Sequence, residues 1–333
     1  MKVGASSFRF NDVYIESAGT AVGVLESEGP LSTYFDVHYD NQYCGQDSWE
    51  KAESELMRSA IETALKKGNL TASKIDVGIG GDLINQLIPT HYTFRQYNIP
   101  FFGVYGACST SMESLILGAI FVESEHANRV MIASSSHNSS AERQFRNPTE
   151  YGGPKNETSQ FTITGAGAAI LSSTLQKIKV ESATAGIIVD AMQKNPSDMG
   201  SAMAPAAAHT ILQHFKDLKV QSTDYDLIVT GDLASIGSPI LIDILKKDGL
   251  DISAIHQDCG KLIFDESQPV YAGGSGAGCC AVVTFGYILQ LLLDGKLKRV
   301  LVVATGALLN TMILQQKETI PCIAHAVTLV AVD

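Results

Sequence analysis

The sequence predicts an α/β fold built from two duplicated halves, with buried mixed sheets related by a pseudo-two-fold axis. Strand-like apolar runs alternate with helix-like runs, which is typical of sheets with helices packed on their faces. The length of 333 residues is sufficient for one large α/β unit or two fused domains. Motifs of the first half also recur in the same order in the second. We therefore expect one half over residues 1–174 and the other over 175–333.

Four segments of the first half have counterparts in the second. Each half runs through a strand followed by Gly-Asp-Leu, a turn of small residues that opens a helix, a further strand, a long loop and a closing strand. The matched segments, first half before second, are 75–83 with 225–233, 105–111 with 271–278, 128–137 with 298–306, and 164–171 with 323–330. Four matches in one order indicate an internal duplication.

The individual elements follow from local composition. The runs at 75–83 and 128–137 are almost continuously apolar, which predicts strands buried on both faces. The stretch 99–105 is strand-like, and the run after it, through Leu115 and Ala119, has the spacing of a helix. The second half repeats this sequence of elements, so we expect a second sheet with its own helices.

Composition and charge exclude several classes of protein. The net charge is −11 and no run of lysine or arginine is present, which argues against a nucleic-acid surface. No apolar window approaches 18 residues, and the N-terminus has no apolar core of signal-peptide length, so we expect neither a membrane span nor a signal peptide. The six cysteines form no C-x-x-C pair, which predicts reduced thiols in the cytoplasm and no structural zinc.

Cys108 stands where the strand-like stretch gives way to the helix. Free amides and the helix dipole at such a position lower the pKa of a thiol, and the same amides can hold an anion. Ligands of open α/β sheets bind at the carboxyl ends of strands, which in two symmetric halves would face one another. This arrangement places Cys108 opposite the turn 271–278. Its residue type fits a nucleophile, a residue lining a binding site, or a small core residue.

The duplicated layout with a cysteine at the start of the central helix resembles the thiolase and ketosynthase superfamily. Longer strings resemble the stage V sporulation protein AD family of spore-forming bacteria, from "ESAGTAVG" near residue 16 to the last strand. These strings are GACSTSMES, SSSHNSSAERQFRNPTEYGG, DMGSAMAPAAAHTI, IVTGDLASIGSPI, YAGGSGAG and VVATGALL followed by QQKETIP. The resemblance implies a thiolase-like fold and a role in binding dipicolinic acid during its uptake into the developing spore.

The resemblance also allows the catalytic residues to be checked. Condensing enzymes of the superfamily carry His or Asn, or a second Cys, at three places in the second half, which act with the nucleophile. This sequence has Thr230–Asp232, Tyr271–Ser275 and Ala304–Leu308 at those places, with no His, Asn or Cys. We therefore expect no catalytic residues, with Cys108 at the ancestral nucleophile position of a binding protein. The alternative is an acyltransferase or ketosynthase-like enzyme that uses Cys108 as its nucleophile.

Candidate ligand contacts follow from the chemistry of a flat dicarboxylate. Backbone amides, an imidazole and arginine side chains suit its carboxylates, and aspartates would face calcium if it accompanies the ligand. The candidate ligand-binding residues are Cys108, Ser109, His137, Asp198, Met203, Asp232, Gly274 and Ser275, with Arg143 and Arg146 as further possibilities. Each aspartate could instead cap a helix, and the arginines could instead hold the loop 138–160 or a dimer contact. We expect no protein-bound metal and no other cofactor.

Partners are implied by the resemblance alone. We expect other stage V sporulation transport proteins to hold the chain at the cytoplasmic face of the spore inner membrane. The superfamily commonly dimerises by pairing sheet edges beside the cysteine helix. Either the strand following Gly103 or the strand 128–136 would form that edge in a homodimer.

Overall fold

The computed structural model describes residues 1–145 and 155–332 and confirms the predicted α/β class. Ten strands form the main path of a mixed sheet, in the order β12-β11-β14-β15-β10-β3-β9-β7-β5-β6. The first five of these are β12 (His256–Asp258), β11 (Leu227–Thr230), β14 (Arg299–Ala307), β15 (Cys322–Ala331) and β10 (Ile178–Thr184). The other five are β3 (Tyr14–Val22), β9 (Gly165–Ser172), β7 (Arg129–Ser136), β5 (Val77–Gly81) and β6 (Phe101–Gly103).

The strand order is the same in both halves when it is read outward from the centre. In each half two antiparallel pairings are followed by two parallel ones. The halves meet where β3 and β10 pair through a single register position, Tyr14 opposite Lys179. The predicted boundary at residues 174 and 175 falls between β9 and β10.

The duplication extends to individual hydrogen bonds. Asp76 accepts from the amides of Asn128 and Arg129 at 2.7 and 2.9 Å. Asp226 accepts from the two corresponding amides, those of residues 298 and 299, at the same distances. In both halves a carboxylate therefore fixes the start of the strand that runs parallel to its neighbour.

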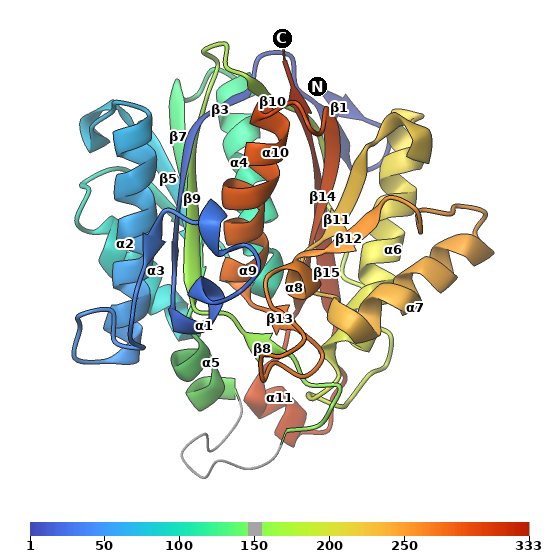
Figure 1. Ribbon diagram of the computed structural model, residues 1–333. Helices are drawn as coiled ribbons and strands as arrows, with labels where there is room; N and C mark the ends of the chain where they lie inside the picture. The colour runs from blue at the N-terminus through green and yellow to red at the C-terminus, as the bar shows by residue number, and fades with distance from the viewer. Residues whose placement is uncertain (146–154, 333) are drawn as a thin grey trace.

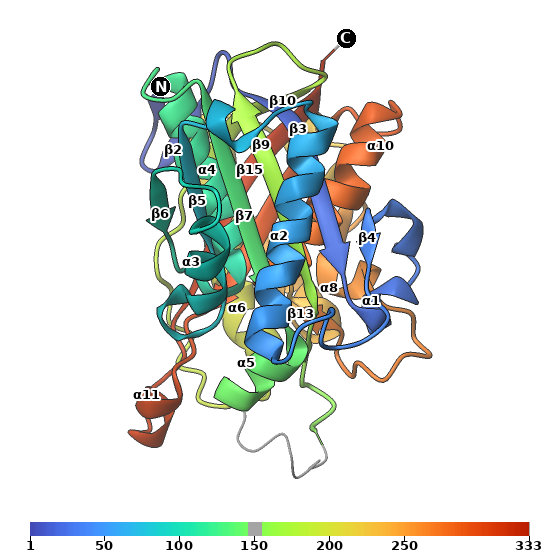
Figure 2. The same ribbon diagram turned by 90° about the vertical axis from the view of Figure 1, so that its left-hand side faces the viewer.

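Helices form three layers around the two halves of the sheet (Figures 1 and 2). The outer helices α2 (Trp49–Lys67) and α6 (Met199–Leu218) pack on opposite outer faces, against β3 and β9 and against β15 and β14. The shorter α3 (Ile88–Phe94) and α7 (Ala234–Lys247) pack beside them. The inner layer consists of α4 (Thr110–Glu123), α9 (Ala277–Val282), a π-helix (Val283–Ile288) and α10 (Leu289–Leu293).

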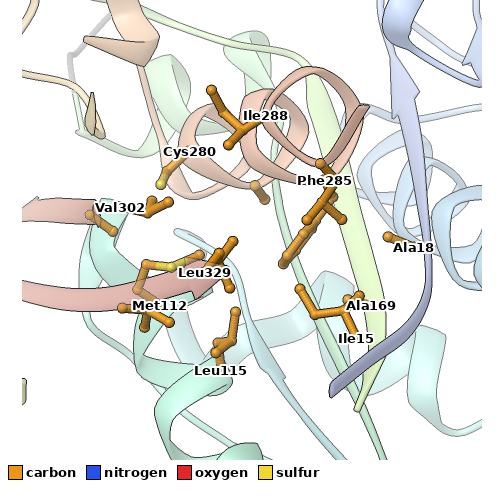
Figure 3. Packing of buried hydrophobic residues seen from close by; sticks show 14 of the residues in the cluster. Ile15, Ala18, Met112, Leu115, Ala169, Cys280, Phe285, Ile288, Val302 and Leu329 are labelled. Atoms are coloured by element: carbon orange, nitrogen blue, oxygen red, sulfur yellow. The ribbon is translucent and has the colours of Figure 1, made fainter. Parts of the chain in front are cut away.

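The inner layer is apolar on all sides because it lies between two sheets. Met112 and Leu115 of α4 and Phe285 of the π-helix contribute to one large buried cluster (Figure 3). Val302 of β14 and Ile15 of β3 reach this cluster from the two halves of the sheet. Most of α4 is buried, and its half-buried side also carries apolar residues (Leu117, Ile120 and Phe121), which is why α4 lacks an amphipathic pattern.

Short elements complete the chain around this frame. They are β1 (Lys2–Val3), β2 (Ser7–Arg9), α1 (Val24–Ser27), β4 (Val37–His38), α5 (Asn138–Phe145), β8 (Phe161–Thr162), α8 (Cys259–Leu262), β13 (Gly274–Ser275) and α11 (Thr311–Gln315). In both views α5 and α11 lie at the same end of the molecule (Figures 1 and 2). Among the helices of the described residues, none has the length and apolarity needed to span a bilayer.

The structure corrects one of the two strands considered for a dimer edge. The strand 128–136 corresponds to β7, which pairs with β5 on one side and β9 on the other. A strand with two partners has no free edge, so it cannot pair with a second chain. The strand near Gly103 is β6, which ends the strand order of the sheet.

Candidate functional site: a small pocket beside Cys108

A small pocket lies between the two halves, at the end of the molecule where α5, β8 and β13 come together (Figure 1). Its cavity volume is about 40 Å³, close to the ~30 Å³ that one water molecule occupies in the liquid. The walls are mostly apolar or aromatic, and residues far apart in sequence form them. The lining residues are Leu83, Tyr105, Ala107, Cys108, Ala141, Glu142, Phe145, Thr162, Met199, Ser275, Gly276, Ala307 and Leu309.

A tight turn before α4 places Cys108 in the pocket wall. Residues 107–109 form one 3₁₀ turn, and Ala107 has a left-handed backbone with φ of 51°. This turn packs directly on β14, because a Cβ added to Gly306 would lie 2.1 Å from the carbonyl oxygen of Gly106. Ser109 is fully buried, and both its amide and its hydroxyl donate to Gly106, at 3.0 and 2.7 Å. The amide and the hydroxyl proton of Ser109 are therefore used within the turn.

The thiol of Cys108 is held in its neutral form. Burial raises its pKa well above the ordinary value, and the negative charge of Asp232 and a hydrogen bond to that carboxylate raise it further. A contribution from the amide of Gly276 acts in the opposite direction and is smaller. The lowering of the thiol pKa expected from a helix start is therefore outweighed. Burial and the neighbouring carboxylate disfavour the thiolate more than the backbone amides favour it.

Asp232 lies behind Cys108 at the end of β11. Its carboxylate accepts from the hydroxyl of Thr305 at 2.7 Å and from the amide of Gly276 at 3.1 Å. Complete burial raises the pKa of Asp232 to about 7, against the lowering effect of these hydrogen bonds. The expected alternative role as a helix cap is wrong. Asp258 instead accepts from the amides of residues 233 and 234, at 2.9 Å each, where α7 begins.

Gly274 and Ser275 form β13, which pairs with β8 beside the pocket. The carbonyl of Ser275 accepts from the amide of Ile163 at 2.8 Å, and Ser275 lines the pocket. Gly274 is buried, and an added Cβ there would meet side chains of Ile263, Ile163 and Phe264 at 3.0–3.2 Å. The turn predicted to face Cys108 is therefore beside it, with Ser275 and Gly276 in the wall.

Three other candidates are engaged away from the pocket wall. The ring of His137 is fully buried, with Nε2 2.7 Å from the carbonyl oxygen of Gln42 and Nδ1 accepting from an amide at 3.2 Å. Asp198 caps α6 by accepting from the amide of Ser201 at 3.2 Å, which is the capping alternative considered above. Met203 is fully buried in the cluster between α6 and the sheet.

The remaining candidates are the two arginines and the two aspartates that were expected to face calcium. Arg143 pairs with Glu50 and stacks over the ring of Trp49, with its guanidinium carbon 5.1 Å from the ring centroid. Arg146 lies outside the described residues. Asp198 and Asp232 have separate partners, and within the described ranges no group of three or more His, Cys, Asp or Glu side chains could hold a metal ion.

Sequence reasoning missed most of the pocket wall. Tyr105, Phe145 and Leu309 line it, yet each belongs to a loop or helix end that periodicity does not describe. Thr305 and Ala307 fall within the 304–308 segment that the superfamily comparison singled out, so that segment was the available signal. Nothing in the sequence indicated that Thr305 would bind Asp232.

Comparisons with known proteins agree with the fold. The family model described as Stage V sporulation protein AD matches residues 4–330. Stage V sporulation protein AD of Bacillus subtilis (strain 168) is 53% identical over 315 residues, covering 95% of this chain and 93% of the relative.

Solved structures show the same fold at low identity. OleA from Xanthomonas campestris, co-crystallised with cerulenin, superposes with a TM-score of 0.63 at 13% identity, covering 97% of this chain and 98% of that one. The 3-oxoacyl-[acyl-carrier-protein] synthase III from Aquifex aeolicus VF5 gives 0.57 at 14% identity, covering 96% and 99%. The predicted thiolase-like fold is confirmed, and at these identities the likeness concerns the fold alone.

Proposed function

The chain belongs to the stage V sporulation protein AD family, and from this premise we propose that it binds dipicolinic acid for uptake into the developing spore. We propose further that it does not catalyse condensation. The observation that carries the proposal is the pocket between the halves, in which Cys108 is present as a neutral thiol beside Asp232. A neutral thiol donates a hydrogen bond but is a poor nucleophile, which suits binding better than acyl transfer.

The pocket chemistry fits one edge of a flat aromatic dicarboxylate. Apolar walls from Leu83, Phe145 and Leu309 would contact the ring, and hydroxyls of the pocket wall such as those of Thr162 and Ser275 would donate to a carboxylate. Calcium enters this proposal only as part of the cargo, where it would neutralise the ligand's carboxylates.

Calorimetric titration with dipicolinate, with and without calcium, tests the proposal. We expect saturable heats with about one ligand per chain, and weaker binding by Cys108→Ala because a side chain of the pocket wall is truncated. Cys44→Ala is the matched control, since Cys44 is also buried but packs in a different cluster, against α2. The absence of binding heat in every condition would contradict the proposal. If Cys108→Ala and Cys44→Ala weaken dipicolinate binding equally, binding stands but its assignment to the Cys108 pocket is wrong.

A second candidate function is acyl transfer through Cys108. The observation that favours it is the position of Cys108 at a helix start in a fold shared with OleA and the synthase III. Exposure to acyl-thioesters followed by mass spectrometry decides between the two candidates. A stable acyl group on Cys108, with turnover lost in Cys108→Ser, would establish the enzyme in place of the binding protein.

We also propose that the chain dimerises through β6 and is held at the cytoplasmic face of the spore inner membrane by other stage V sporulation transport proteins. Support for the dimer comes from the position of β6 at the end of the sheet and from Phe102 on it, which is 51% exposed. Sedimentation should give a dimer that Phe102→Glu converts to a monomer. Retention in the membrane fraction after deletion of the partner proteins would contradict attachment through those partners.

A further inference from the structure

The helix α5 forms one wall of the pocket beside Cys108. Ala141 and Phe145 line the pocket from this helix, with Glu142 between them. Ala141 and Phe145 are four residues apart, so they lie on the same face of the helix, and both pack in the small apolar cluster that includes Cys108. The shape of the pocket therefore depends on what fixes the position of α5.

A buried carboxylate ties α5 to α2 and to the sheet. Glu53 of α2 is fully buried, and its two oxygens accept from the hydroxyl of Ser140 on α5 at 2.8 Å and from that of Ser135 on β7 at 3.1 Å. The Ser140 hydroxyl also lies 3.1 Å from the carbonyl oxygen of His137, but the carboxylate is nearer and is the stronger acceptor. In both views α5 lies beside the end of α2 (Figures 1 and 2).

The other attachments of α5 lie at its start, at the surface or on the segment that follows it. The amide of Asn138, its first residue, donates to a hydroxyl of the turn before β9 at 3.0 Å. Arg143 pairs with Glu50 where both side chains are partly exposed, and such pairs contribute little. Glu142 pairs with Lys155 at 3.1 Å, but Lys155 belongs to the segment after α5. Ser140 thus supplies a buried attachment from the middle of the helix.

We infer that Glu53 is a positioning residue for the pocket: by holding Ser140 it sets where α5 places Ala141 and Phe145. The inference rests on the proposed function and deepens it, because Glu53 acts on dipicolinate binding without touching the ligand. Supporting hydrogen bonds of this kind keep a binding site in its geometry. Without the Glu53 carboxylate, the Ser140 hydroxyl loses its nearest acceptor and α5 is free to shift against the opposite wall. A closely packed wall tolerates little displacement, so affinity should fall although the fold remains.

A tryptophan beside this link reports on the position of α5. Trp49 is the only tryptophan of the chain and is the first residue of α2. Arg143 of α5 lies over its ring, with the guanidinium carbon 5.1 Å from the ring centroid. Indole emission responds to a cation held against the ring, so the fluorescence of Trp49 follows α5 whether or not a ligand is present. Arg143→Ala gives the reference emission for a lost contact.

The test combines Trp49 emission with calorimetric dipicolinate titration of the intact chain. Ser140→Ala removes the link from the side of α5. Ser139→Ala is the matched control, because Ser139 is its neighbour in the helix and its hydroxyl makes no hydrogen bond to any of the described residues. We expect Ser140→Ala to bind roughly tenfold more weakly, a factor that one hydrogen bond to a carboxylate can supply. Its emission should move toward that of Arg143→Ala, and Ser139→Ala should match the wild type in both measurements.

Substitution of Glu53 itself provides the rescue. Glu53→Gln can keep both contacts, since its carbonyl accepts from one hydroxyl and its amide donates to the other, so it should bind and fluoresce like the wild type. Glu53→Ala should behave like Ser140→Ala. If circular dichroism shows that Glu53→Ala is unfolded, Ser140→Ala and Glu53→Gln decide the question.

Wild-type affinity or wild-type emission in a folded Ser140→Ala would overturn the inference, and so would weak binding by Glu53→Gln. If the wild-type chain does not bind dipicolinate, the proposed function fails instead. The emission of Ser140→Ala then decides by itself whether Glu53 holds α5 in place.

Discussion

Replacing Asp258 with alanine is expected to lower the free energy of unfolding by at least about 4 kcal/mol, because buried donors left without an acceptor cost about 1–3 kcal/mol each. Its carboxylate accepts from the hydroxyl of Thr230 at 2.6 Å and from the amides of Leu233, Ala234 and Gly260 at 2.9 Å each. All four donors lie where β11, α7 and α8 meet. The residue is almost completely buried, so water cannot replace the carboxylate without opening this junction.

Urea unfolding followed by circular dichroism measures this loss. Asp251→Ala is the matched control, because Asp251 also accepts from an amide two residues onward, at 2.9 Å, but lies exposed at the surface. We expect the control to unfold at the wild-type urea concentration. If the two variants have the same midpoint, the four hydrogen bonds of Asp258 do not hold this junction together.

Replacing Gly306 with alanine is expected to cost roughly 1–3 kcal/mol in stability, the usual range for overpacking a dense interior, and to abolish ligand binding. The new Cβ would lie 2.1 Å from the carbonyl oxygen of Gly106 and 3.1 Å from the amide nitrogen of Ser109. Both are backbone atoms, so relief of the clash must move the whole turn that carries Cys108. The pocket wall would be displaced with it.

Thermal unfolding and dipicolinate titration of the same sample check both parts of this expectation. Gly103→Ala is the control, because the nearest atoms to its Cβ would be the ends of the Leu87, His91 and Phe101 side chains, at 3.0, 3.2 and 3.4 Å. Those ends can rotate away, so stability and binding should be retained. Normal dipicolinate binding by Gly306→Ala would show that binding does not depend on the position of the Cys108 turn against β14.

The order of strands and helices along the chain could be predicted from the sequence because its signal is repeated. Apolar runs at 128–137 and 298–306 became β7 and β14, which occupy equivalent positions in the two halves. Each run contains a continuous apolar stretch, 130–133 in the first and 300–304 in the second, and the two recur in the same order within their halves. The pairing of β3 with β10 at a single register position could not be predicted in this way. It depends on how the two folded halves pack against each other, and no local sequence pattern encodes that.

The site could be predicted only where it lies at a turn. Cys108 and Ser275 belong to turns rich in small residues and both line the pocket. His137 and Met203 were chosen for their neighbourhood in sequence, and the structure buries both away from the pocket wall. The expected low pKa of Cys108 was wrong because a helix start is a local property, whereas the opposing carboxylate comes from the other half.

The pairing of β3 has a consequence for synthesis of the chain. This strand ends at Val22, but its main partner β9 begins at Gly165 and its neighbour on the other side, β10, begins later still. A ribosome adding 5–20 residues per second needs roughly 7–30 s to supply β9 after β3 has been made. Throughout that interval the apolar residues of β3 have no sheet to join. Neither half can close around its centre before translation has passed the midpoint, so this first strand is exposed to aggregation while the chain is being made.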